Sequence, residues 1–76
     1  MGQAKRPANM KMTLKTAREL AGLTQSAAAQ EIGVSVDTLG NYERGKYYPD
    51  IPVLKKIEAV YGVHYNQLIF LPLDFG

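Results

Sequence analysis

From Thr13 onward, glycines divide the chain into short segments whose apolar residues recur at helical spacing. Each of the first four segments begins at a residue whose side chain can cap a helix N-terminus, and each ends at a glycine, the residue favoured after a helix C-terminus. The caps and their glycines are Thr13 and Gly22, Thr24 and Gly33, Ser35 and Gly45, and Asp50 and Gly62. This pattern predicts short helices, which become stable only when they pack their apolar faces together.

The rest of the pattern predicts one more helix. A short fifth helix from about Tyr65 to Phe70 is ended by Pro72, and residues alternate only in the tail, at Leu71, Leu73 and Phe75. We therefore predict an all-α fold, a compact bundle of four to five short helices. The apolar residues predicted to face the core are Leu14, Ala17, Leu20 and Ala21 in the first helix and Ile51, Leu54, Ile57 and Tyr61 in the fourth.

The chain has 76 residues, which is enough for one domain. Five of its nine basic residues precede the first acidic residue, Glu19. We predict a flexible basic N-terminal arm at residues 1–12, a helical domain at residues 13–70 and a short apolar tail at residues 71–76. A basic arm suits a polyanion and could enter the DNA minor groove, but a disordered leader has the same composition.

The composition argues against an enzyme and against a metal or cofactor site. The chain has no cysteine and a single histidine, His64, which we interpret as a capping or solvent-facing group and not as a catalytic base. Its carboxylates are scattered without the spacing of a metal loop, and no glycine-rich phosphate loop follows a strand. No apolar run is long enough for a membrane span or a secretory signal, so we expect a cytoplasmic protein without a small-molecule ligand.

The segment SVDTLGNYERGK, residues 35–46, has an unusual polar face for a structural helix. Gly40 lies in its middle, where glycine costs about 1 kcal/mol relative to alanine. The residues opposite Leu39 combine an apolar group, a carboxylate, a bare backbone, an amide and a cation. They are Val36, Asp37, Gly40, Asn41 and Arg44. An ordinary solvent-exposed face would carry Glu and Lys at helical spacing, so this face is a candidate contact surface.

The tight Gly33–Val34–Ser35 connection joins this helix to the preceding one as in a helix-turn-helix motif. In that motif the second helix lies in the DNA major groove. Val36 can then contact a thymine methyl group, Asp37 can accept from cytosine N4, and Asn41 can pair with adenine. Gly40 would let the helix backbone approach the duplex closely.

A second group of residues lies where phosphates of the DNA backbone would be. Thr24 and Gln25 stand at the N-terminus of the preceding helix, where backbone N–H groups favour an anion. Arg44, Lys46 and Tyr47 follow the recognition helix and can contact the flanking backbone. Tyr47 and its neighbour Tyr48 could instead simply pack in the loop before Pro49.

The stretch GLTQSAAAQEIGVSVDTLGNYERGKYYPD resembles the lambda-repressor/Cro-like, or Xre-type, helix-turn-helix family over about residues 13–70. The matching positions are Gly22-Leu23-Thr24-Gln25, Ala29, Gly33-Val34-Ser35, Leu39, Glu43-Arg44-Gly45-Lys46 and Pro49. The resemblance implies a small phage or prophage repressor that binds operator DNA as a homodimer. It also implies that Gln25 contacts phosphate and supports the recognition helix, and that Arg18 and Glu43 form a structural salt bridge.

Two functions therefore remain as hypotheses. The first is a sequence-specific regulator of transcription that binds a double-stranded DNA operator through the helix of residues 35–44. The second is a protein-interaction module, such as an antitoxin or adaptor, with weak DNA binding. Val36, Asp37 and Gly40 offer few hydrogen-bond donors, and the tail residues Leu71, Leu73 and Phe75 could form a dimer or partner contact.

Overall fold

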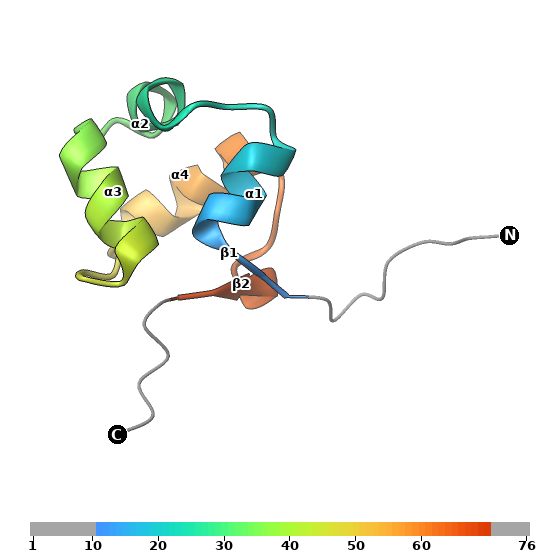
Figure 1. Ribbon diagram of the computed structural model, residues 1–76. Coiled ribbons are helices and arrows are strands. Elements are labelled where there is room, and N and C mark those ends of the chain that lie inside the picture. Colours follow the sequence, from blue (N-terminus) through green and yellow to red (C-terminus); the bar gives the residue numbers. More distant parts are fainter. Residues whose placement is uncertain (1–10, 71–76) are drawn as a thin grey trace, which may run out of the picture.

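The computed structural model describes residues 11–70, which form four helices around one core (Figure 1). The helices are α1 (Leu14–Leu20), α2 (Gln25–Ile32), α3 (Val36–Arg44) and α4 (Ile51–Tyr61). One turn of 3-10 helix follows at Tyr65–Gln67, and two short strands, β1 (Met12–Thr13) and β2 (Leu68–Ile69), lie side by side. The predicted bundle of short helices is confirmed. Residues 1–10 of the predicted arm and the predicted tail, residues 71–76, lie outside the described residues.

The helix boundaries follow from capping. The side-chain oxygens of the predicted N-caps Thr13, Thr24, Ser35 and Asp50 each accept a hydrogen bond from the backbone N–H three residues later, at 3.0–3.1 Å. Gly33, at the end of α2, has φ of 93°, a left-handed conformation that residues with a Cβ rarely adopt. Its N–H donates to the carbonyl oxygen of Ala29 at 2.8 Å, so the turn into α3 starts without an unpaired backbone group.

The core lies where α2 meets the other helices. Its fully buried large side chains are Ile32, Leu39 and Ile57, contributed by α2, α3 and α4. Ala28 and Ala29 of α2 are also buried, and their small side chains let the neighbouring helices approach closely. This packing holds α2 and α3 as one unit.

The strand pair corrects two predictions at the ends of the domain. Met12 pairs with Leu68 and Thr13 with Ile69 in a parallel arrangement, and Met12 is only 9% exposed. Met12 therefore belongs to the core and not to the predicted flexible arm. The predicted helix from Tyr65 to Phe70 is helical only up to Gln67, because the next two residues extend to pair with β1.

Three residues predicted to face the core are exposed instead: Leu20, Ile51 and Ala21, the last being the C-cap of α1. Leu20 and Ile51 have 64% and 63% of their surface exposed to solvent. Leu20 is the last residue of α1 and Ile51 the first of α4. At such positions a helix has neighbouring turns on one side only, so helical periodicity overestimates burial there.

We expect Met12→Ala to lower the free energy of unfolding by about 2 kcal/mol, because truncating a buried methionine removes apolar contacts and leaves a cavity. In a domain of this size, each 1 kcal/mol lowers the melting temperature by about 4–8 °C. Thermal denaturation followed by circular dichroism measures this change.

Lys11→Ala is the matched control, since the Lys11 side chain is exposed and its ammonium group donates only to the carbonyl oxygen of Asn66. We expect a change below about 0.5 kcal/mol for this variant. Equal melting temperatures for Met12→Ala and Lys11→Ala would show that β1 does not contribute to the core.

Candidate nucleic-acid interface

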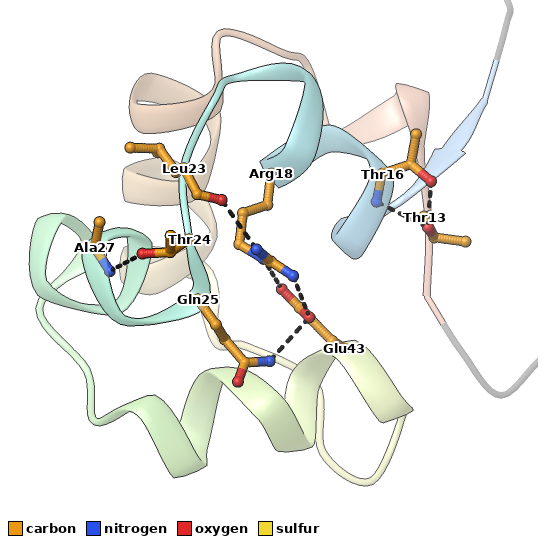
Figure 2. A network of polar contacts seen from close by, with 8 residues as sticks. All are labelled: Thr13, Thr16, Arg18, Leu23, Thr24, Gln25, Ala27 and Glu43. Carbon is orange, nitrogen blue, oxygen red and sulfur yellow. Dashed lines mark hydrogen bonds and ion pairs between the residues drawn. The ribbon is translucent and has the colours of Figure 1, made fainter.

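A network of polar side chains joins α1, α2 and α3 and sets the geometry of the site (Figure 2). Arg18 of α1 donates from Nε to Glu43 Oε2 at 2.6 Å and from Nη2 to Glu43 Oε1 at 3.3 Å. The remaining guanidinium nitrogen, Nη1, donates to the carbonyl oxygen of Leu23 at 2.9 Å. The ion pair expected between Arg18 and Glu43 is therefore present, and it joins α1 to the C-terminal part of α3.

Gln25 attaches α2 to the same carboxylate. Its Nε2 atom donates to Glu43 Oε1 at 3.1 Å, so Glu43 accepts hydrogen bonds from two other helices. The expected support of the recognition helix by Gln25 is thus visible as a direct contact. The side chains of Arg18 and Glu43 are only 10% and 6% exposed, and their hydrogen bonds raise the pKa of Arg18 although burial opposes this. The guanidinium group of Arg18 is therefore held in its charged form beside Glu43.

Tyr61 lies close to this ion pair and was expected only as a core residue. It is 7% exposed, and its buried hydroxyl group has no hydrogen-bond partner among the described residues. Burial raises the pKa of Tyr61 to about 12, and the negative charge of Glu43 adds to the increase while Arg18 opposes it. The neutral phenol is therefore strongly favoured inside the fold.

The predicted base-facing residues do not all lie in one exposed row. Val36 is 41% exposed and Asp37 is exposed, while Asn41 is half-buried. Gly40 is buried: a Cβ atom at this position would lie 3.3 Å from Arg44 Nη1 and 3.6 Å from Gln25 Nε2. The side chains of Arg44 and Gln25 thus cover Gly40. The prediction that Gly40 faces outward is wrong.

The side chain of Arg44 folds back along α3 toward Asn41. Its Nη2 atom donates to Asn41 Oδ1 at 2.6 Å, and the side chain is exposed. This contact places the guanidinium group next to the predicted base-facing residue Asn41, whereas the sequence predicted a contact with the flanking DNA backbone. The spacing of Asn41 and Arg44, three residues apart on a helix, was a signal that sequence analysis could have used.

The other predicted phosphate ligands are on the surface. Thr24, Lys46 and Tyr47 are exposed, although the Thr24 hydroxyl also caps α2. Tyr48 packs edge-on against Phe70, with ring centroids 6.0 Å apart. Tyr48 has this intramolecular contact, yet 62% of its surface is exposed, compared with 55% for Tyr47, so both tyrosines remain available to a partner.

Other candidate chemistry is sparse in the part of the chain that the structure describes. His64 is exposed and precedes the 3-10 helix, where its backbone N–H donates to Gln67 Oε1 at 2.9 Å. No group of three or more His, Asp or Glu residues between residues 11 and 70 is arranged to hold a metal ion. No helix within the same range is long and apolar enough to cross a membrane.

Comparison with known proteins now decides the family. A family model described as helix-turn-helix matches residues 14–68, which span all four helices. The chain belongs to this family, as the Xre-type resemblance predicted. No solved structure matches the chain.

Two relatives are informative. The chain is 43% identical over 65 residues to the uncharacterized HTH-type transcriptional regulator MJ0272 of Methanocaldococcus jannaschii, an alignment covering 86% of this chain and 98% of the relative. It is 39% identical over 56 residues to the HTH-type transcriptional regulator ImmR of Bacillus subtilis. That alignment covers 74% of this chain but only 44% of ImmR, so the similarity concerns less than half of that relative.

We expect Arg18→Met to destabilise the helix-turn-helix domain by about 3–5 kcal/mol, because Glu43 would keep a buried charge without its counterion. The double variant Arg18→Met/Glu43→Leu should lose much less of its free energy of unfolding, because it leaves no unpaired charge in the core. Urea denaturation of the two single variants and the double variant gives the coupling energy. Additive effects of the two substitutions would contradict a direct, buried interaction.

The titration of Tyr61 predicts a loss of stability at alkaline pH. In the unfolded chain Tyr61 loses its proton near its ordinary pKa of 10, whereas in the folded protein it does so at about 12. Between these values the unfolded state binds fewer protons, so the free energy of unfolding falls as the pH rises.

Tyr61→Phe should remove this part of the alkaline loss. Tyr42 adds its own part to the alkaline loss of stability, because burial raises the pKa of Tyr42 as well. The measurement is urea denaturation at pH 8 to 11 for the wild type, Tyr61→Phe and the exposed-site control Tyr47→Phe. A parallel decline for the wild type and Tyr61→Phe would show that Tyr61 titrates alike in both states.

Proposed function

We propose that this helix-turn-helix protein is a sequence-specific regulator of transcription that binds double-stranded DNA with α3 in the major groove. The observation that carries the proposal is the fixed orientation of α3. Glu43 ties its inner side to α1 and α2, while Val36, Asp37, Asn41 and Arg44 remain on its accessible side. A recognition helix needs this rigidity, because base contacts depend on side chains held at defined positions in the groove.

The relatives and the charges support the same function. Both named relatives are HTH-type transcriptional regulators. Arg44 and Lys46 place positive charge at the C-terminal end of α3, and Tyr47 follows as an exposed hydroxyl donor. With the N-terminus of α2, Lys46 and Tyr47 would contact phosphates on the two sides of the groove. We propose a cytoplasmic repressor of the phage type that acts as a homodimer, with recognition helices roughly 34 Å apart.

A second candidate function rests on a surface hollow on α4. The hollow has a volume of about 360 Å³ and is lined by Ile51, Leu54, Lys55, Glu58 and Tyr65. Ile51 and Tyr65, which are 63% and 59% exposed, lie together at this hollow, and adjoining exposed apolar side chains are typical of a contact surface. A protein-interaction module would use such a surface, and its binding would depend little on salt.

The test is a selection from a pool of random duplexes at about 150 mM salt, followed by fluorescence anisotropy of the selected duplex across salt concentrations. A DNA-binding regulator should enrich a palindrome, and its affinity should fall with salt at a log–log slope of about −0.9 per neutralised phosphate. No enrichment, with weak binding to every duplex, would contradict the proposal and favour the interaction module.

Lys46→Ala should weaken binding to all duplexes alike and reduce the magnitude of the salt slope by about 0.9, because it removes one phosphate contact. Lys55→Ala is the matched control, since Lys55 is an exposed lysine of α4 in the surface hollow. An equal effect of the two substitutions would mean that only overall charge matters, and that the proposed placement of α3 is wrong.

A further inference from the structure

We propose that Asn41 and Arg44 act as one recognition unit that selects guanine, in place of the adenine contact expected for Asn41 alone. This inference rests on the proposed DNA-binding function and concerns the base that the accessible side of α3 would select. Its starting observation is the 2.6 Å hydrogen bond from Arg44 Nη2 to Asn41 Oδ1.

The partner of Asn41 fixes the orientation of its amide group. A guanidinium group has only N–H donors, so the atom of Asn41 that meets it must be the carbonyl oxygen. A hydrogen bond with a charged donor is also stronger than one between neutral groups. For a ligand Asn41 keeps its Nδ2 donors and the second lone pair of Oδ1, beside the remaining N–H donors of Arg44.

Adenine does not match this arrangement. Its major-groove edge has one acceptor, N7, and one donor, the N6 amino group, so asparagine must offer both a donor and an acceptor. Here the oxygen of Asn41 already accepts from Arg44, and the positive guanidinium group beside its second lone pair disfavours a further partly positive donor such as the N6 amino group. Guanine instead offers two acceptors, N7 and O6, which suit a positively charged surface rich in donors.

Gly40 makes this arrangement possible. It lies one helical turn before Arg44, and long helical side chains lean toward the preceding turn. A Cβ atom at Gly40 would lie 3.3 Å from Arg44 Nη1, closer than about nine in ten such contacts in proteins, so the guanidinium group would have to shift by a few tenths of an ångström. The missing side chain therefore leaves the space that the guanidinium group occupies, which explains a glycine in the middle of a recognition helix.

The charge of Arg44 is available for a ligand. Between residues 11 and 70 the ion pair in the structure joins Arg18 to Glu43, and Arg44 has no carboxylate partner there. Asp37, the other charged residue predicted to face bases, is seven residues away in α3. Arg44 therefore keeps a full positive charge next to Asn41, where the acceptor-rich edge of guanine is most favoured.

The experiment compares the wild type with Arg44→Ala in the random-duplex selection. The base pair that Asn41 contacts is the one at which Asn41→Ala relaxes the preference. We expect guanine at this position for the wild type. For Arg44→Ala we expect a shift to adenine, because the released Asn41 oxygen can accept from N6. Affinity for the guanine duplex should fall about 5- to 150-fold, more than affinity for the adenine duplex.

Gly40→Ala provides a second variant that keeps Arg44. It should weaken guanine selection in the same direction by shifting the guanidinium group, while the higher helix propensity of alanine offsets the crowding that the added Cβ causes. Lys46→Ala is the control and should lower affinity for both duplexes equally. Melting curves of each variant establish that the domain is folded.

The outcomes separate this inference from the proposed function. A palindrome with guanine at the Asn41 position, and its shift to adenine in Arg44→Ala, supports the recognition unit. A palindrome with adenine in the wild type, or equal losses on both duplexes in Arg44→Ala, overturns it and leaves DNA binding intact. Failure of the wild type to enrich any duplex overturns the proposed function and this inference together.

Discussion

The placement of α3 depends on one buried carboxylate. Glu43 lies on α3 itself, yet its hydrogen-bond donors, Arg18 and Gln25, come from α1 and α2. Apolar packing around Leu39 holds α3 against the core, but packing alone tolerates small shifts along and around the helix axis. The directional contacts of Glu43 remove that freedom, so the outer residues of α3 are presented at fixed angles.

Local signals in the sequence predicted most of the fold. Caps such as Ser35 and glycines such as Gly33 determine where the helices begin and end, because their effects depend only on nearby backbone atoms. The strand pair of Met12 and Leu68 could not be predicted in this way. Two residues are too few to show alternation, and their pairing depends on how the helices between them fold. The prediction that Leu20 faces the core was wrong for a related reason. Helical periodicity identifies one side of a helix, but it does not show how far along that side the neighbouring helix extends.

The sequence likewise predicted some features of the candidate site and missed others. The Arg18–Glu43 pair followed from a family resemblance, and the structure supplies the reason for it in the additional contacts to Leu23 and Gln25. For Gly40 and Arg44 the sequence identified the correct helical face but not the arrangement of side chains on it. A long side chain can lie over a glycine one turn away, and a helical projection of the sequence cannot show which residue then covers which.

Pairing between β1 and β2 also affects the order in which the domain can form during synthesis. The first and last described parts of the domain contact each other, so the core remains incomplete until Leu68 has left the ribosome. The α2–α3 unit is synthesised well before that point and can fold through contacts close in sequence. Met12 can pair only after Leu68 has been synthesised. A nascent chain that stalls before β2 would carry the helix-turn-helix unit but expose apolar core residues, and chaperones and proteases act on such surfaces.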